Sequence, residues 1–411
     1  NTHLLRGRVA IGGIICQICA GMLYSWSLYV NPLVATHGWA RSAVTLTFSI
    51  TTLLIPIFMI FAGRVMPKWG PTKTALFGAV SLACGLVVAG FSKSILLLYL
   101  GYGVLGGIGV GFIYGVPIAT SVKWFPDKKG LISGLTVAGF GIGSIVYAPI
   151  CSRLIEAIGP DKTFLIQAAA IVVGMIIGAP MMKTAPDGYT PDGWTPSNAA
   201  AAVTKYSYTS SEMLKLKQYW FLLIMYLFAN VAGLFIIGQA SPISQEIAGL
   251  TPIEAGTIVS VLSIANTIGR LAGGAATDKL GAARVVTIVY ILDFVLFLVL
   301  RFMTSYALIA IGLGGLAVCF GAMMGAYPAL VLDYFGPNYY STNYAFIFLA
   351  YGIGGLIAAN VATLSISRFG GYLMAFIIIG VSCAVGVVMS LISKPPAHAQ
   401  PSESMNCQGE N

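Results

Sequence analysis

Twelve apolar runs, each long enough to cross a bilayer as a helix, divide this chain and constrain its fold more than any other feature. A helix needs about 20 apolar residues to cross a hydrocarbon core of about 30 Å. Runs of this length exceed barrel strands, and backbone groups in lipid must satisfy their own hydrogen bonds, so helices remain. The approximate spans are 9–34, 43–66, 74–91, 95–122, 131–157, 163–182, 218–243, 254–277, 285–302, 305–334, 342–367 and 371–393. The sequence predicts an all-α integral membrane protein with 12 transmembrane helices.

The composition points to lipid as the main solvent. Hydrophobic residues make up 57% of the chain and charged residues only 9%, against about 25% charged residues in soluble domains. The net charge of +9 is unevenly spread: with a cytoplasmic N-terminus, fifteen Lys and Arg residues fall on the cytoplasmic side and six outside. This asymmetry predicts that both termini are cytoplasmic, with the bilayer and not nucleic acid as the partner. Only Arg270 is left, deep inside a span.

Sequence landmarks recur at one offset and indicate an internal duplication. The segment "GRVMPKWG" at 63–70 matches "GAATDKLG" at 274–281, and "GIG" at 141–143 recurs at 352–354, both 211 residues later. Two homologous six-helix bundles around a central cavity are therefore expected. The predicted units are an N-terminal bundle at 1–182, a cytoplasmic linker loop at 183–217, a C-terminal bundle at 218–393 and a disordered tail at 394–411.

The motifs resemble those of a known transporter family. The two halves, the long middle loop and the "DKLG" turn after span 8 resemble the major facilitator superfamily. Within it, "YSWSLYVNPL" at 24–33, "WFPDKKGLISGLTVAGFGIG" at 124–143 and "NYAFIFLAYGIGG" at 343–355 are similar to the oxalate/formate antiporter family, and the span 8 arginine resembles that of animal monocarboxylate transporters. The resemblance implies a bacterial plasma-membrane transporter of small carboxylates. It also implies that a gating salt bridge is lost in the first half, where Pro67 replaces the family's usual aspartate.

Arg270 is the strongest candidate for a functional residue. A central arginine costs about 2.5–3.5 kcal/mol on insertion scales and stays ionised, so something must compensate for its charge. One alternative is a fixed ion pair with Asp293, at comparable depth in span 9; the other is bidentate pairing with a transported carboxylate. Span 9 lies outside the cavity in the superfamily, which favours the carboxylate. Asn266, four residues earlier, shares the arginine's helix face and could orient the guanidinium or bond a substrate hydroxyl.

Further candidates lie near the midpoints of spans that line the cavity in this family, with aromatic packing as the alternative reading. They are Tyr24, Tyr114, Asn230, Tyr327 and Tyr351, together with Leu28 on the face of Tyr24. The alignment with the oxalate antiporter places Tyr351 where that family has a second cationic residue, a lysine. One arginine balances one carboxylate, and a dianion would leave a negative charge desolvated. Monocarboxylates such as lactate, pyruvate, acetate or formate are therefore expected.

Two loop motifs and a glycine stripe are expected to shape the conformational change. Asp127 and Lys128, and Asp278 and Lys279, are interpreted as cytoplasmic contacts that hold an outward-open state shut from inside. Span 4 also carries glycines at a four-residue spacing, which favours close approach of another helix. These glycines are Gly103, Gly107, Gly111 and Gly115.

The expected function is secondary active transport of small monocarboxylates by alternating access, with proton symport as the coupling and anion exchange of the oxalate/formate type as the alternative. Asp293 is the only carboxylate inside a span away from its ends, which makes it a candidate proton site. An enzyme is not expected, because HExxH and GxSxG motifs are missing. No cofactor or metal is expected, and without a P-loop no ATP. A receptor is the other alternative, and it would bind ligand without counterflow of that ligand across vesicle membranes.

Overall fold

A computed structural model describes residues 2–186, 189–191 and 207–396, and helices account for most of them. The first half contains α1 (Thr2–Ala20), η1 (Gly21–Trp26), α2 (Ser27–His37), α3 (Arg41–Gly90), α4 (Ile95–Leu98), η2 (Tyr99–Leu105), α5 (Gly106–Trp124), η3 (Pro126–Lys128), α6 (Lys129–Ile158), α7 (Pro160–Gly178) and η4 (Ala179–Met181). The second half contains α9 (Ser210–Met213), α10 (Lys217–Ala248), α11 (Pro252–Leu280), α12 (Ala282–Val299), η5 (Leu300–Phe302), α13 (Tyr306–Phe335), α14 (Tyr340–Phe369) and α15 (Leu373–Ile392).

Eleven helical stretches among these residues are long and apolar enough to cross a membrane, and one of them accounts for two crossings. Ala43–Gly90 contains 48 residues, which at 1.5 Å per residue extend about 72 Å, more than twice the hydrocarbon thickness. Gly70, with φ of 76° and ψ of 164°, interrupts the helix at this point. Such a left-handed φ favours glycine, which has no Cβ. Twelve crossings result, as predicted.

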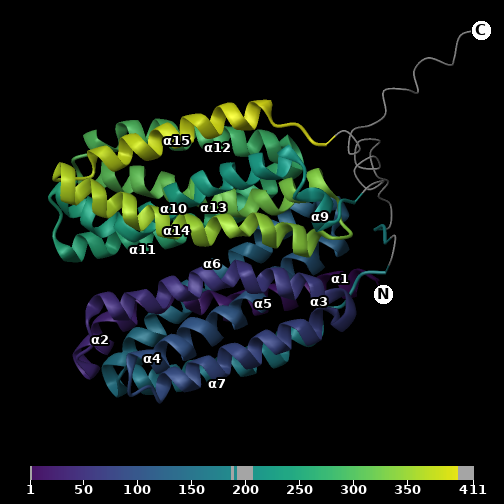
Figure 1. Cartoon of the computed structure of the whole chain (residues 1–411), viewed down its shortest axis with the longest axis horizontal. Coiled ribbons are helices and arrows are strands. Elements are labelled where there is room, and N and C mark those ends of the chain that lie inside the picture. Colours follow the sequence, from purple (N-terminus) through teal and green to yellow (C-terminus); the bar gives the residue numbers. More distant parts are fainter. Residues whose placement is uncertain (1, 187–188, 192–206, 397–411) are drawn as a thin grey trace, which may run out of the picture.

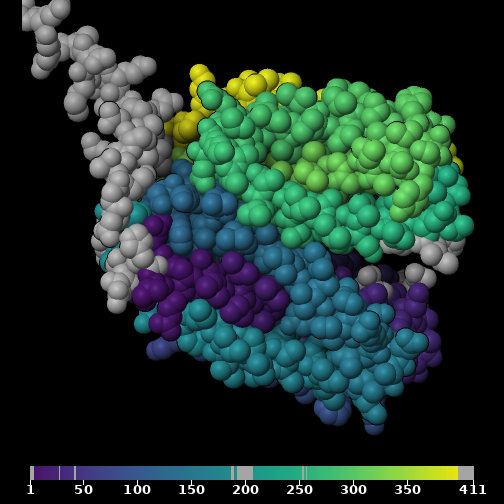
Figure 2. All heavy atoms as spheres, turned by 180° about the vertical axis from the view of Figure 1, so that it is seen from behind, coloured from purple at the N-terminus to yellow at the C-terminus, as the bar shows by residue number. Residues whose placement is uncertain are grey.

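The crossings form two bundles, α1 to α7 and α10 to α15 (Figure 1). The internal repeat is visible in the backbone, because Gly281, 211 residues after Gly70, has a similar φ of 83° and ψ of 144° between α11 and α12. Helix α1 begins and α15 ends at one end of the molecule, which we call the terminal end (Figure 1). The two bundles meet at this end, whereas a notch separates their surfaces at the opposite end (Figure 2).

The two bundles touch mainly through α6 against α11 and α3 against α14. Glycines allow the close approach at both interfaces. A Cβ on Gly134 would lie 2.6 Å from the carbonyl oxygen of Arg270 and 2.9 Å from the Cα of Gly274. A Cβ on Gly63 would lie 2.8 Å from the amide nitrogen of Thr342. Backbone therefore packs directly on backbone near the terminal end.

The glycine stripe of span 4 packs as the sequence predicts. Cβ atoms built on Gly103, Gly107, Gly111 and Gly115 would lie 3.2, 2.9, 2.6 and 2.9 Å from atoms of α3. The stripe therefore brings α5 close to α3 within the first bundle.

We expect Gly134→Ala to weaken the contact between the bundles, because its Cβ would displace the backbone of α11. Overpacking of this kind costs about 1–3 kcal/mol, so the apparent melting temperature of the purified protein should fall. Gly314→Ala in α13 is the matched control, because its Cβ would meet no atom within 4 Å. Equal melting temperatures for the two variants would contradict the assignment.

Candidate functional site

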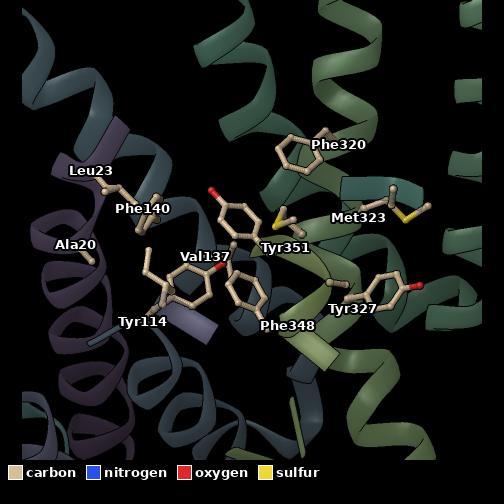
Figure 3. Packing of buried hydrophobic residues seen from close by; sticks show 14 of the residues in the cluster. Ala20, Leu23, Tyr114, Val137, Phe140, Phe320, Met323, Tyr327, Phe348 and Tyr351 are labelled. Carbon is tan, nitrogen blue, oxygen red and sulfur yellow. The ribbon is translucent and has the colours of Figure 1, made fainter. Parts of the chain in front are cut away.

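A small cavity lies between the two bundles, and Figure 3 shows five of the side chains that line it among other buried residues: Leu23, Tyr114, Phe140, Phe348 and Tyr351. Its volume is about 10 Å³, close to the space that one water molecule requires. Aromatic rings from both halves enclose it, so a ligand would have to move them apart. The lining consists of Leu23, Tyr24, Ile55, Val110, Tyr114, Phe140, Met324, Phe348 and Tyr351.

The guanidinium of Arg270 lies beside this cavity, and only 1% of the residue is exposed. Its Nε donates to the Oδ1 of Asn266 at 2.9 Å, and its Nη1 donates to the carbonyl oxygen of Val137 at 3.2 Å. The third contact is from Nη2 to the hydroxyl of Tyr24 at 3.4 Å. Asn266 thus orients the guanidinium, as the four-residue spacing predicts, and every acceptor is neutral.

The tyrosines of the two halves meet above this guanidinium. The hydroxyl oxygens of Tyr24 and Tyr351 lie 3.1 Å apart, across the boundary between the bundles. The ring of Tyr114 stacks on Phe348 with centroids 4.9 Å apart, and its edge contacts Phe140. A single cation beside phenolic hydroxyls and an apolar wall is suited to binding one carboxylate with a short apolar substituent.

Asp293 does not balance this charge. Its side chain is buried on α12, within hydrogen-bonding reach of the Cys319 thiol on α13 and close to Cys383 on α15. All of these groups lie inside the second bundle. In the part of the chain that the structure describes, no carboxylate pairs with Arg270. The ion pair considered as the alternative is therefore not formed.

The structure does not bring three of the candidates to the cavity. Tyr327 directs its hydroxyl to the carbonyl oxygen of Leu222 at 3.4 Å, away from the cavity (Figure 3). The Nδ2 of Asn230 bonds the carbonyl oxygen of Tyr226 in its own helix at 2.7 Å. Leu28 is half-buried and packs against the core. Leu23 and Phe140, which the sequence did not single out, line the cavity instead.

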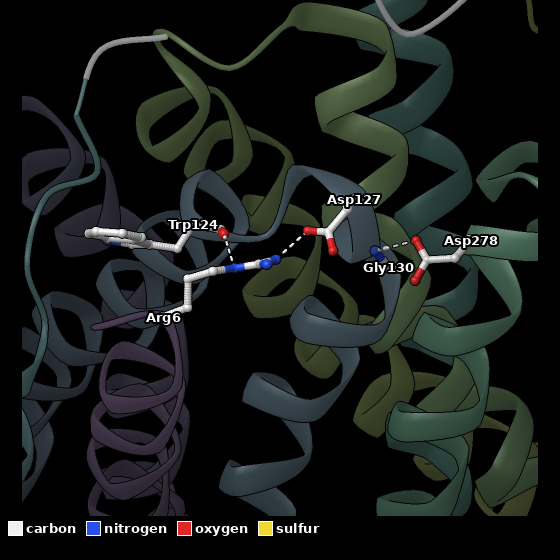
Figure 4. A network of polar contacts seen from close by, with 5 residues as sticks. All are labelled: Arg6, Trp124, Asp127, Gly130 and Asp278. Atoms are coloured by element: carbon white, nitrogen blue, oxygen red, sulfur yellow. Dashed lines mark hydrogen bonds and ion pairs between the residues drawn. The ribbon is translucent and has the colours of Figure 1, made fainter. Parts of the chain in front are cut away.

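The terminal end is closed by polar contacts between loops and helix ends. The carboxylate of Asp278 accepts a hydrogen bond from the amide of Gly130 at 2.8 Å (Figure 4) and another from the amide of Leu131 at 2.7 Å. These N–H groups lie in the first turn of α6, where backbone amides have no acceptor within the helix and a negative charge is favoured. Asp278 on α11 therefore caps a helix of the other bundle.

Neighbouring contacts reinforce this closure. Arg6 forms an ion pair with Asp127 and donates to the carbonyl oxygen of Trp124 at 2.9 Å (Figure 4). Lys129 forms an ion pair with Asp333 of the other bundle. The two predicted motif lysines, Lys128 and Lys279, are exposed. Asp127 and Asp278 thus make contacts at this end, but Asp127 pairs with Arg6 and Asp278 with backbone amides.

The aromatic residues of α14 extend from this closed end to the cavity. Tyr340 stacks on Tyr344 with centroids 5.9 Å apart, and Phe348 stacks on Tyr351 with centroids 5.0 Å apart. The hydroxyl of Tyr340 is buried and has no hydrogen-bond partner among the described residues. These rings fill the space between the cavity and the terminal end.

Comparisons with known proteins identify the family. The model of the Major Facilitator Superfamily matches residues 13–359 and 249–406, so the chain belongs to this superfamily of transporters, which are not enzymes. YhjX of Escherichia coli K12, described as an uncharacterized MFS-type transporter, is 34% identical over 87% of both chains. The oxalate:formate antiporter of Oxalobacter formigenes is 28% identical over 93% of this chain and 89% of its own.

Other relatives agree with this fold. Human monocarboxylate transporter 12 is 24% identical over 88% of this chain and 73% of its own. The solved structure of the transporter FucP in the outward conformation superimposes with a TM-score of 0.74 at 14% identity, covering 96% of this chain and all of FucP. At that identity the likeness shows the fold alone. The predicted fold class and the predicted family resemblance are confirmed.

We expect Asp278→Asn to loosen the terminal end, because an amide cannot accept from both N–H groups and carries no charge. Charges at helix N-termini contribute about 0.3–1 kcal/mol, and up to about 2 kcal/mol when partly buried. The readout is the alkylation rate of a thiol introduced by Ser133→Cys, since Ser133 is fully buried at this interface. The rate should rise roughly two- to thirtyfold. Lys279→Gln next to it should leave the rate unchanged; an unchanged rate in Asp278→Asn would refute the cap.

Proposed function

We propose that this chain is a secondary active transporter of small monocarboxylates of the lactate and pyruvate class. The observation that carries the proposal is the charge of Arg270, which is buried between the bundles and contacts only neutral oxygens. A permanent charge away from water needs a counter-charge. A carboxylate that enters the cavity supplies one and can accept two parallel N–H bonds from the guanidinium.

The relatives support a carboxylate substrate and the cavity favours one negative charge. Two relatives carry names that refer to oxalate and formate and to monocarboxylates. The position expected to hold a second cation in the oxalate antiporter is Tyr351, whose hydroxyl pairs with that of Tyr24. A second carboxylate would face phenols and aliphatic side chains and stay unbalanced, which is unfavourable at low dielectric.

Alternating access provides the mechanism. The bundles are closed at the terminal end by Asp278 and separated by a notch at the opposite end. We place the terminal end in the cytoplasm of a bacterial cell, since most basic residues of the chain fall on that side of the membrane. On this orientation the structure faces outward. Binding a carboxylate neutralises Arg270, which allows the bundles to rock around it.

Arg270→Lys is expected to reduce carboxylate uptake roughly 10- to 100-fold, because an ammonium ion cannot reproduce the paired hydrogen bonds of the guanidinium fork. Uptake of labelled lactate into proteoliposomes measures the effect, and gel filtration checks that the variant folds. The matched control is Arg368→Lys at the exposed end of α14, which should transport normally. A folded Arg270→Lys variant with full uptake would refute the anchor.

Coupling to protons is the finer part of the proposal, with anion exchange as the alternative. Labelled lactate is offered to proteoliposomes under an inward proton gradient, with or without monocarboxylate inside. Gradient-driven uptake into empty vesicles indicates symport. Uptake only into preloaded vesicles indicates exchange, which would agree with the non-titrating Asn266 beside the arginine.

Asp293→Asn tests the proposed proton site. The side chain is enclosed between α12, α13 and α15, where an amide of the same shape can replace a carboxyl group. If Asp293 carries the proton, the variant keeps lactate exchange and loses gradient-driven uptake. Asp161→Asn near His37 is the control, because that carboxylate lies at the beginning of α7. Gradient-driven uptake that persists in Asp293→Asn would exclude this residue.

A further inference from the structure

The two interfaces between the bundles are related by the internal repeat, but only one of them has a carboxylate. At the first interface, Asp278 accepts from the amides of Gly130 and Leu131 at the beginning of α6. The residues 211 positions after Gly130 and Leu131 are Ser341 and Thr342, at the beginning of α14. Subtracting 211 from Asp278 gives Pro67 on α3. The second interface therefore lacks the side chain that caps the first.

In the first turn of α14, two adjacent backbone amides have no acceptor among the described residues, those of Ser341 and Thr342. Tyr339 at the N-cap position makes no side-chain hydrogen bond to the helix. The amide of Tyr340 donates to the carbonyl oxygen of Pro337 at 3.4 Å, and that of Asn343 donates to the carbonyl oxygen of Tyr339 at 3.0 Å. Over the ranges that the structure describes, no backbone carbonyl accepts from the amides of Ser341 and Thr342, which lie between these two residues.

A cavity occupies the place of the missing carboxylate. Its volume is about 140 Å³, and Pro67, Ser341 and Thr342 all lie on its wall. Ser341 and Thr342 are each only 8% exposed, and within the described chain neither hydroxyl has a hydrogen-bond partner. Thr120 and Lys123 of α5 also line the cavity, as do Thr184 and Ala185 after η4. Buried donors that have no acceptor among the described residues are the chemistry of an anion site.

We propose that this cavity is a second binding site, distinct from the one at Arg270, and that it takes a small oxyanion such as a carboxylate or phosphate group. The oxyanion accepts from the first turn of α14 as Asp278 does from α6. At the first interface, the two carboxylate oxygens of Asp278 already accept from two adjacent amides in this way.

Binding at this site is coupled to the conformation of the protein. The wall combines α3 and α5 of one bundle with the beginning of α14 of the other, so the site is complete only when the terminal end is closed. A ligand that binds one state alone shifts the population toward it. An oxyanion on the terminal side therefore holds the closed state, and its departure is a condition for opening. This inference depends on the fold and not on the identity of the transported substrate.

Binding of radiolabelled inorganic phosphate and of radiolabelled acetate to the purified full chain tests the proposal directly. Sodium chloride keeps the ionic strength constant. We expect saturable binding of at least one of the two anions. Pro67→Asp, which supplies a protein carboxylate at the site, should weaken that binding at least about tenfold. Thr342→Val removes one hydroxyl donor and keeps the shape of the side chain, so anion binding should weaken roughly three- to tenfold.

Two controls separate this site from other sources of binding. Thr363→Val lies on the exposed far part of α14 and should bind like the original protein. Arg270→Lys should keep phosphate binding and lose only the acetate that binds at the central site, which separates this site from the central one and from the proposed transport function. As a readout that does not depend on the added anion, Pro67→Asp should slow alkylation of a thiol introduced by Ser133→Cys.

The outcomes are decisive in either direction. Phosphate binding that acetate does not displace identifies a separate oxyanion as the ligand, whereas displacement by acetate identifies a carboxylate, including one on its way out of the carrier. Absence of saturable binding of either anion, or equal displacement by chloride, overturns the proposal. It is also overturned if Thr342→Val binds unchanged, or if Arg270→Lys abolishes the binding of both anions. Should Pro67→Asp fail to fold, Ser341→Ala replaces it with the same expected loss.

Discussion

The uncompensated charge of Arg270 is the constraint on which the rest of this structure depends. Burying a permanent cation in a membrane protein is expensive, so its surroundings must supply oriented oxygens. Those oxygens come from both bundles: Asn266 from its own helix, Val137 and Tyr24 from the other half. Close backbone contact makes this geometry possible, since α6 reaches the arginine's helix at Gly134. The charge therefore links the two bundles beside the central cavity.

The internal repeat explains how the ends of the molecule are organised. The same glycine break follows α11 and divides α3, and a helix begins at each equivalent place across the interface. What differs is the residue three positions before the break, Asp278 in one copy and Pro67 in the other. Duplication gives two gates with one backbone geometry. Divergence of a single side chain then gives them different requirements, one satisfied by the protein and one by a solute.

Much of the fold could be predicted from sequence, because lipid imposes helix length and hydropathy directly. Arg270, Asn266, Tyr24 and Tyr351 were recognisable as polar groups at the middle of apolar runs, and the structure brings them together. Depth along a helix, however, does not define rotation about its axis. Tyr327 lies at the right depth, but its hydroxyl reaches the carbonyl oxygen of Leu222.

Loop contacts were predictable in place but not in partner. The acidic residues of the two motifs were correctly located at the closed end. The ion pairs of Arg6 with Asp127 and of Lys129 with Asp333 could not be predicted, because they depend on how distant helices approach one another. The ligand-sized cavity beside Pro67 follows from a missing carboxylate, which the sequence showed only as a departure from a motif. The two amides on its wall that have no acceptor among the described residues become visible only when α14 is placed against α3.

The buried hydroxyl of Tyr340 has an implication for the energetics of the cycle. Among the described residues this hydroxyl has no hydrogen-bond partner, and such a group destabilises the state that buries it by about 1–3 kcal/mol. Opening the terminal end would hydrate that hydroxyl and recover this free energy. A carrier must keep its two orientations nearly equal in free energy, because a gate whose every polar group were satisfied would rarely open. The unsatisfied hydroxyl on α14 thus raises the free energy of the closed state and offsets part of the stabilisation that the hydrogen bonds of Asp278 provide.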